Sequence, residues 1–297
     1  MSNKPRKMTL EKKHNLTGWA FLAPATFLIA VFSFWPMIKA LVLSFQTGKG
    51  RNMQMAGFTN YIRMFQDDVF IQSIKNTFFY FILQVPIMLV VAMVLACILN
   101  KKDLRFKGFF RTMIFLPCTT SLVAYSIIFR SLFANDGLVN YVLVNLGILD
   151  KPYNFLTQPF AAKMVILLGL LWRWTGYNMV FYLAGLQNIE YSVYEAAKID
   201  GANGWKTFWK ITVPLLKPTI IMTFIMSING TLQLFDESVN LTKGGPANST
   251  ITMSHYIYNT CFINVPNFGY AAAMSFIIFI MVAVLAFINL KVGDTRD

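Results

Sequence analysis

The sequence predicts an all-α integral membrane protein with six transmembrane helices. Of its 297 residues, 56% are hydrophobic and only 13% are charged, whereas a soluble globular domain usually carries about 25% charged residues. The apolar residues gather in six separate runs, each long enough to cross the roughly 30 Å hydrocarbon core of a bilayer. Helices are the expected form because lipid offers the backbone no hydrogen-bond partners, and the alternating pattern of membrane β-strands is absent.

The six runs define one membrane domain. They cover residues 16–45, 76–99, 109–133, 160–186, 214–235 and 269–290, so the domain is expected over residues 16–291, between a short N-terminal segment (1–15) and a tail (292–297). The first run is longer than the roughly 7–15 apolar residues of a secretory signal and continues past Trp35 and Pro36. We therefore expect it to remain as a helix.

The charges between the runs predict the orientation. Cytoplasmic loops retain Lys and Arg, and these residues divide sixteen to six between the two alternating sets of segments. The richer set contains both termini and the loops after the second and fourth runs. All of these are therefore predicted to lie in the cytoplasm.

Two of the predicted outer loops have patterns of their own. Residues 135–150 place apolar side chains near helical spacing after Gly137, which predicts a short helix on the membrane surface. Residues 236–268 are rich in Thr, Asn, Gly and Pro, which predicts a long outer loop. Its length suggests that it contacts another molecule.

Several functions are disfavoured by composition and motifs. The net charge of +13 does not indicate nucleic-acid binding, because Lys and Arg occur in short clusters between apolar runs. No nucleophile elbow, zinc-protease motif or phosphate-binding loop occurs in the sequence. We expect no metal site and no disulfide framework, because the spacing of the cysteines and histidines fits neither. These residues are Cys97, Cys118, Cys261, His14 and His255.

The predicted cytoplasmic loop of residues 188–213 has the most informative pattern. Ser192 and Glu195 match a capping box, in which two side chains satisfy the first free amides of a helix. Gly201 can end that helix in a left-handed conformation. The pattern therefore predicts a short helix that stops at Gly201.

A second short helix is expected after this turn. Trp205, Phe208 and Trp209 stand at i, i+3 and i+4, which makes one aromatic face, and Pro214 is expected to begin the fifth span. From the residues alone, this helix-turn-helix could rest in the headgroup region as an amphipathic hairpin or bind a cytoplasmic partner.

The same loop resembles the EAA loop of ABC importer permeases. The matching residues are Glu195, Ala196, Ala197, Gly201, Ala202, Ile211 and Pro214, with Val213 where the general pattern has Leu. In that family the loop is the coupling helix, which docks in a groove of a cytoplasmic ATPase dimer. The resemblance implies that this chain is not an enzyme and binds no cofactor, because the partner ATPase handles ATP and Mg²⁺.

Further segments resemble carbohydrate permeases of the maltose type. They are residues 19–24, 35–36, 58–61, 111–117, 194–202, 242–246 and 256–258. The resemblance implies a type I ABC importer permease bundle in the bacterial cytoplasmic membrane, which receives a sugar or oligosaccharide from an extracytoplasmic binding protein. It also implies a heterodimer, because the member with a long N-terminal first span usually pairs with a second, homologous permease.

Polar residues inside the runs are candidates for the substrate pathway, because buried polar groups are costly in lipid. Amides and aromatic rings suit the hydroxyl groups and apolar ring faces of a sugar. The alternative for each residue is a hydrogen bond between helices, and for Asp236 and Glu237 a solvated helix end. The pathway candidates are Gln84, Tyr177, Asn178, Asn229, Gln233 and Asp236.

Two other transport functions are compatible with the sequence. A glycerol phosphate or polyol importer would favour a positive pathway, to which Arg130 or the deeper Arg173 could contribute. Arg173 could instead pair with a partner subunit. An ion-coupled carrier is less favoured, because the runs lack paired acidic residues of the kind that relay protons.

Overall fold

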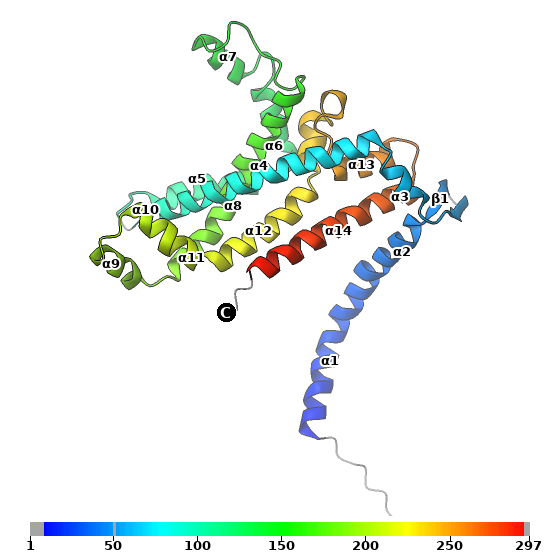
Figure 1. Ribbon diagram of the computed structural model, residues 1–297, viewed down its shortest axis with the longest axis horizontal. Coiled ribbons are helices and arrows are strands. Elements are labelled where there is room, and N and C mark those ends of the chain that lie inside the picture. Colours follow the sequence, from blue (N-terminus) through cyan, green and yellow to red (C-terminus); the bar gives the residue numbers. More distant parts are fainter. Residues whose placement is uncertain (1–8, 50–51, 102, 294–297) are drawn as a thin grey trace, which may run out of the picture.

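The computed structural model describes residues 9–49, 52–101 and 103–293, which form a bundle of helices as predicted (Figure 1). Among these residues, four helical stretches are long and apolar enough to cross a membrane, and two bent pairs of helices raise the number to six if each pair is one span. The four are the arm α1–α2 (Leu10–Ser44), α4 (Asp68–Leu99), α8 (Pro159–Gln187) and α14 (Phe268–Gly293).

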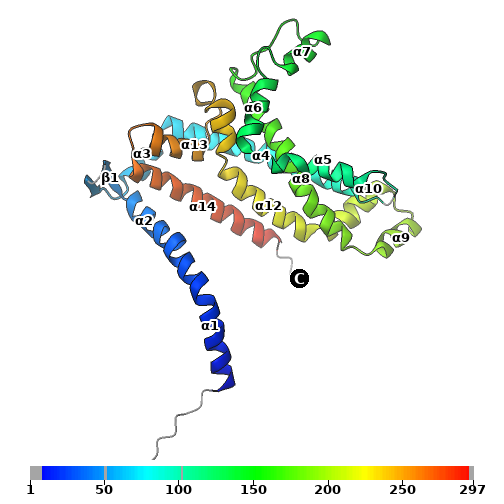
Figure 2. The ribbon, with the colours of Figure 1, turned by 180° about the vertical axis from the view of Figure 1, so that it is seen from behind.

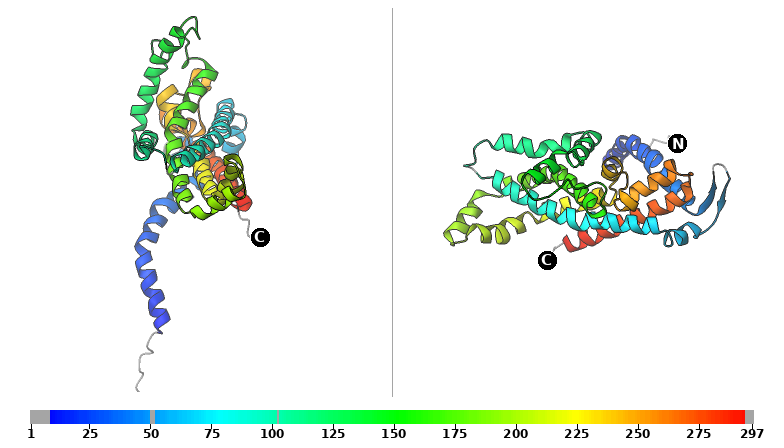
Figure 3. Two further views of the ribbon diagram at one scale, coloured as in Figure 1. Left: turned by 90° about the vertical axis from the view of Figure 1, so that its left-hand side faces the viewer. Right: turned by 90° about the horizontal axis from the view of Figure 1, so that it is seen from above.

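The N-terminal arm is one long apolar helix with a π-helical turn. α1 (Leu10–Ile29) continues through η1 (Ala30–Phe34) into α2 (Trp35–Ser44). Helix begins at Leu10, so the predicted N-terminal segment 1–15 is helical in part; residues 1–8 of that segment and 294–297 of the predicted tail lie outside the described residues. Figures 2 and 3 show the arm leaving the bundle, and only the end of α2 packs against α14.

The third predicted span is broken, so the expectation of one continuous helix over residues 109–133 is wrong. α5 (Lys107–Thr119) and α6 (Leu122–Leu132) meet at an angle of 99°. Thr120 and Ser121 between them have extended backbones, with ψ of 148° and 135°. The chain turns at these two residues, and α6 continues toward the short surface helix α7 (Leu138–Asn145), which follows Gly137 as predicted.

The fifth predicted span is also bent, by 70°. α10 (Gly204–Thr207), η2 (Phe208–Thr212) and α11 (Val213–Leu215) precede the bend, and α12 (Lys217–Leu232) follows it. Pro214 therefore lies before the bend and does not begin the long helix, contrary to expectation. Pro218 occupies the first turn of α12, where a missing amide donor costs least.

The predicted long outer loop is a folded unit instead of an irregular one. It contains η3 (Ser238–Thr242), η4 (Pro246–Asn248), α13 (Met253–Tyr258) and η5 (Asn259–Ile263). The Nδ2 of Asn76 on α4 donates to the backbone oxygens of Asn248 (3.0 Å) and Ile251 (2.9 Å). These bonds fix the segment on the end of α4.

A small hairpin and α3 join the arm to α4. β1 (Gln46–Lys49) pairs antiparallel with β2 (Asn52–Met55), with Gln46 opposite Met55, and α3 (Thr59–Met64) follows. The Nδ2 of the buried Asn60 donates to the backbone oxygens of Ser44 (2.9 Å) and Gln46 (2.8 Å). These strands, which lie in a loop between two spans, were not predicted.

The core lies where α4, α8 and α12 pack together. Buried apolar side chains of α4 and α8, including Met88 and Tyr182, form its largest cluster. At Gly176 an added Cβ would collide with the backbone of Ile114, so α5 passes α8 in backbone contact. This packing fixes the positions of α4, α8 and α12 relative to one another.

Asp67 caps α4 and ties it to two other elements. Its Oδ1 accepts from the amides of Val69 (3.0 Å) and Phe70 (3.2 Å), and its Oδ2 accepts from the hydroxyls of Tyr256 (2.6 Å) and Tyr270 (2.7 Å). Burial raises the pKa of this carboxyl, but the four hydrogen bonds to its charged form outweigh burial and hold the pKa below its ordinary value.

The stability that Asp67 contributes is expected to be present above the ordinary carboxyl pKa and to be lost as the pH falls through the lower folded-state value. Asp67→Asn should lower the thermal unfolding midpoint of the purified protein near pH 7, and the difference from the unaltered protein should close below about pH 4. Asp68→Asn, at the exposed neighbour, is the matched control and should change little. A difference that did not vary with pH would contradict this assignment.

Candidate functional site

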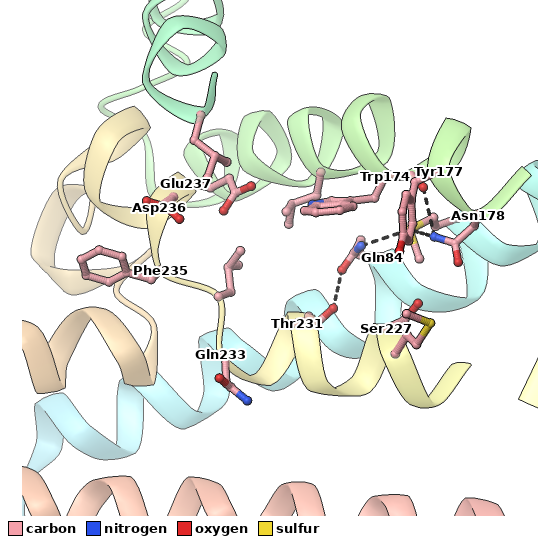
Figure 4. A pocket seen from close by; sticks show the side chains of 16 residues that line it. Gln84, Trp174, Tyr177, Asn178, Ser227, Thr231, Gln233, Phe235, Asp236 and Glu237 are labelled. Atoms are coloured by element: carbon pink, nitrogen blue, oxygen red, sulfur yellow. Dashed lines mark hydrogen bonds between the residues drawn. The ribbon is translucent and has the colours of Figure 1, made fainter. Parts of the chain in front are cut away.

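A cavity of about 300 Å³ lies between α4, α8, α12 and the segment that follows α12 (Figure 4). Five of the six predicted pathway residues are among its lining residues, and four of them are Gln84, Tyr177, Asn178 and Asp236. A fifth, Gln233, lies at its edge. The other lining residues are Met88, Leu122, Leu170, Trp174, Met226, Ser227, Gly230, Thr231, Leu234, Phe235 and Glu237.

The amides in the cavity also connect the helices. Oε1 of Gln84 on α4 accepts from the Thr231 hydroxyl of α12 (2.8 Å). Nδ2 of Asn178 on α8 donates to the backbone oxygen of Trp174 (3.0 Å) and to the sulfur of Met88 on α4 (3.4 Å). Hydrogen bonding between helices and lining of the cavity therefore occur together at Gln84 and Asn178.

Two aromatic rings form one wall of the cavity. The ring centroids of Trp174 and Tyr177 lie 5.8 Å apart and nearly perpendicular. On the facing helix, Ser227 and Thr231 add hydroxyl groups one turn apart. We did not predict Trp174, Ser227 or Thr231 as pathway residues. Trp174 stands three and four positions before Tyr177 and Asn178 and so shares their helical face, whereas Ser227 and Thr231 stand two positions from the predicted Asn229 and Gln233 and lie on another face.

The structure separates Asn229 and Gln233 from the inner part of the cavity. Asn229 is exposed and is not among the lining residues. Figure 4 shows the Gln233 side chain directed away from Trp174 and Tyr177, and its amide nitrogen donates to the Asn229 side chain. These two residues face another side of α12.

Acidic groups stand at one end of the cavity. Asp236 is partly buried, whereas Glu237 is only 3% exposed, so the expectation of a solvated helix end is wrong for Glu237. Burial raises the pKa of the Glu237 carboxyl above its ordinary value, and the neighbouring Asp236 charge adds to the effect. Among the described residues, the cavity lining contains neither Lys nor Arg.

Arg173 holds the break in the third span together. Its Nη1 donates to the backbone oxygen of Thr120 (2.9 Å), and its Nη2 lies 3.4 Å from that of Cys118. A longer contact of 3.5 Å reaches the Pro117 carbonyl, and the guanidinium packs 5.3 Å from the ring centre of Tyr125. The side chain is only 6% exposed. It is thus engaged within the chain and does not line the cavity.

The loop of residues 188–213 forms the predicted helix-turn-helix at the far end of the bundle. α9 (Tyr191–Ile199) ends at Gly201, whose φ is +72°. The amide of Gly201 donates to the Lys198 oxygen (3.1 Å) and that of Ala202 to the Ala197 oxygen (2.9 Å). This is the pair of hydrogen bonds of a Schellman motif, so the left-handed stop at Gly201 is as predicted.

The start of α9 differs from the predicted capping box. The residue before the helix is Glu190, no side chain caps the first turn, and the Ser192 hydroxyl donates to the Glu190 carboxylate (3.3 Å). The helix therefore begins one residue before Ser192, which is already helical. Because a residue inside the first turn has no extended backbone, Ser192 cannot take the role of the cap.

The loop presents some of the EAA-like residues and buries others. Glu195 and Ala196 are exposed, whereas Ala197 is only 5% exposed. Pro214 is exposed, and Ile211 and Ala202 are half-buried. Glu195 and Ala196 thus lie on a surface that a partner can contact.

The aromatic face of the second helix is divided between solvent and core. Trp205 is 71% exposed and packs on Trp209 with ring centroids 5.7 Å apart. Phe208 packs against the apolar cluster of α4 and α8. Behind this face, a hollow of about 910 Å³ separates the hairpin from the ends of α4 and α8, and Tyr194, Lys198 and Lys101 are among the residues around it.

Comparisons with known proteins agree with this architecture. Residues 69–293 match the family described as binding-protein-dependent transport system inner membrane component. The chain is 52% identical to the lactose transport system permease protein of Rhizobium radiobacter over 98% of both chains. It is 31% identical to the sn-glycerol-3-phosphate transport system permease protein of Agrobacterium fabrum, over 95% of this chain and 96% of the relative.

A solved structure has the same fold. A chain of a bacterial alginate ABC transporter, in complex with a periplasmic protein that holds an alginate pentasaccharide, superposes with a TM-score of 0.82 at 25% identity and covers 96% of each chain. The family match, the extensive identity and the shared fold lead to one conclusion. This chain is a multi-pass membrane protein that belongs to the family of binding-protein-dependent transport system inner membrane components.

Proposed function

We propose that this chain is a permease subunit of an ABC importer that moves an uncharged sugar or oligosaccharide into the cytoplasm. The carrying observation is the cavity, in which the rings of Trp174 and Tyr177 stand opposite hydroxyl and amide groups of α4 and α12. Aromatic faces suit the apolar face of a sugar ring, and amides and hydroxyls suit its hydroxyl groups. The lactose relative supports the same substrate class.

A glycerol phosphate substrate is less well supported by this cavity. An anion would favour a positively charged lining, but the described residues of the lining include Asp236 and Glu237 and no Lys or Arg. Arg173 binds carbonyl groups of the broken span, and Arg130 is exposed on α6. Neither of the two arginines that we considered for binding an anion therefore lines the cavity.

We name residues 188–213 the coupling hairpin, which would connect the cavity to ATP hydrolysis in a partner ATPase dimer. The partner would bind ATP and Mg²⁺ and carry out the hydrolysis. Exposed Glu195 and Ala196 would lie against the ATPase, and the hairpin's ends continue into α8 and α12, both of which line the cavity. Movement of the hairpin would thus be passed to two cavity walls. The importer would work in the bacterial cytoplasmic membrane with both termini in the cytoplasm.

A second, homologous permease would complete the membrane part. The arm exposes large apolar side chains along its whole length, with Phe21 at 83% and Phe32 at 73%. An apolar helix that leaves its own bundle offers a surface for the helices of a neighbouring subunit. A heterodimer with a shared pathway would also enlarge the cavity beyond one subunit.

We expect Trp174→Ala to raise the sugar concentration that gives half-maximal ATPase stimulation by about tenfold, because stacking of an aromatic ring on a sugar contributes on the order of 1 kcal/mol or more. The measurement uses proteoliposomes with the partner permease, ATPase and binding protein, and a panel of saccharides and glycerol phosphate. Asn229→Ala, on the other side of α12, is the matched control and should leave the curve unchanged. Stimulation by glycerol phosphate alone would contradict the sugar assignment.

A further inference from the structure

A second groove, of about 300 Å³, lies on the predicted outer side of the bundle and is not part of the central cavity. We name it the Arg63 groove, and its polar lining comprises Arg63, Tyr256, Thr260, Asn264, Asn267 and Tyr270. These residues come from α3, from the folded outer segment and from the start of α14. The transport steps described above do not use it.

Arg63 offers an unused set of donors to this groove. Its guanidinium lies over the ring of Tyr270, with 4.5 Å between the guanidinium carbon and the ring centre. The residue is exposed, and its side chain forms no hydrogen bond or ion pair with another described residue. Because stacking occupies only the flat face of a guanidinium, the N–H groups at its edge remain available for a planar acceptor.

The acid nearest to the groove is already satisfied. Both oxygens of Asp67 are taken, by the hydroxyls of Tyr256 and Tyr270 and by two backbone amides. Asn267 contributes a further donor, since its Oδ1 accepts from the amide of Tyr270 (3.1 Å) and its Nδ2 is left to donate. The groove is therefore rich in donors and suits a carboxylate.

Val265 also lines the groove, and two exposed aromatic residues lie next to lining residues in the sequence and pair with each other, namely Phe262 and Phe268. Phe262 is 68% exposed, Val265 is 65% exposed and Phe268 is 45% exposed. An arginine with an aromatic platform beside exposed apolar side chains is the composition of a protein-binding hot spot. The position, on loops and short helices at the predicted outer end of the bundle, is accessible to a protein outside the cytoplasm.

We propose that the Arg63 groove receives an aspartate or glutamate side chain of the extracytoplasmic binding protein and thereby anchors that protein on this subunit. This proposal rests on the proposed function, because it requires an importer that is fed by a binding protein. A carboxylate fits the fork of Arg63 in two parallel hydrogen bonds. The exposed apolar side chains would pack beside that contact.

The test uses the complete importer in phosphatidylcholine vesicles, with the binding protein that restores sugar-stimulated ATPase activity. Arg63→Gln should raise the binding-protein concentration for half-maximal stimulation by about tenfold and leave basal activity unchanged. Arg63→Lys should fall between, because it keeps the charge but loses the fork. Arg130→Gln, at an exposed arginine of α6, is the matched control. Added salt should weaken the unaltered complex more than Arg63→Gln.

Three results would overturn the proposal. One is an unchanged half-maximal concentration in Arg63→Gln. Another is a defect that occurs only in vesicles with anionic lipid, which would assign the groove to a phospholipid headgroup. The third is an equal loss of basal and stimulated activity with a lower thermal unfolding midpoint, which would make the stacking on Tyr270 merely structural. If the unaltered complex were not stimulated at all, the proposed function itself would fail.

Discussion

Replacing Gly201 by valine is expected to abolish sugar uptake while the assembled ATPase continues to hydrolyse ATP without control by the sugar. Gly201 has a φ of +72°, where an L-residue costs about 1–2 kcal/mol and a β-branched residue more. An added Cβ would meet no atom within 4 Å, so the effect comes from the backbone and not from a collision. Loss of the turn would change the angle between α9 and the following helix and release the docking surface.

Gly201→Asn is the matched control for this prediction. Asparagine tolerates the left-handed conformation better than other residues with a side chain, so this variant should keep most of the uptake. Uptake and ATP hydrolysis are measured together in proteoliposomes, because uncoupling is visible only in their ratio. If the valine and asparagine variants failed alike, contact of the side chain with a partner would be responsible instead of backbone conformation.

Replacing Arg173 by methionine is expected to be the most destabilising single change at the broken span. The long side chain would still fill much of the space, but the carbonyls of Thr120 and Cys118 would lose their donor. A buried acceptor without a partner costs about 1–3 kcal/mol, and no intrahelical amide is available at the break. We expect a lower thermal unfolding midpoint of the purified protein and a loss of transport of more than about tenfold.

Two further variants separate the causes at Arg173. Arg173→Lys keeps the charge but cannot reach several carbonyls with one fork, so it should restore only part of the stability. Arg130→Met removes an exposed arginine of α6 and should leave the midpoint nearly unchanged. A stable Arg173→Met protein with normal transport would show that the break does not depend on this side chain.

The long helices were predictable because a run of apolar residues must satisfy its backbone within the segment once it lies in lipid. α4, α8 and α14 accordingly include the predicted runs 76–99, 160–186 and 269–290. The two bent spans were not predictable from hydrophobicity, since apolar residues stand close to each bend on both sides, namely Leu116 and Leu122 at the first and Leu215 and Ile220 at the second. The chain at the bend near Thr120 is hydrogen-bonded by Arg173, which lies 53 residues further along the sequence.

Part of the cavity was likewise predictable from polar residues within apolar runs. Gln84, Tyr177 and Asn178 line the cavity, as expected for polar residues within apolar runs. Asn229 is not, because hydrophobicity does not tell which side of a helix faces a neighbour. Trp174 was missed because an aromatic residue in an apolar run carries no polar signal.

The hollow behind the coupling hairpin has a mechanical consequence. A close-packed layer resists displacement, because every side chain in it must find a new position. The hairpin instead stands over a hollow of about 910 Å³, and its side chains Ile189, Phe208 and Val213 pack against the apolar cluster of α4 and α8. We therefore expect the hairpin to tilt about its two ends without compressing the bundle, so that its movement is passed along α8 and α12.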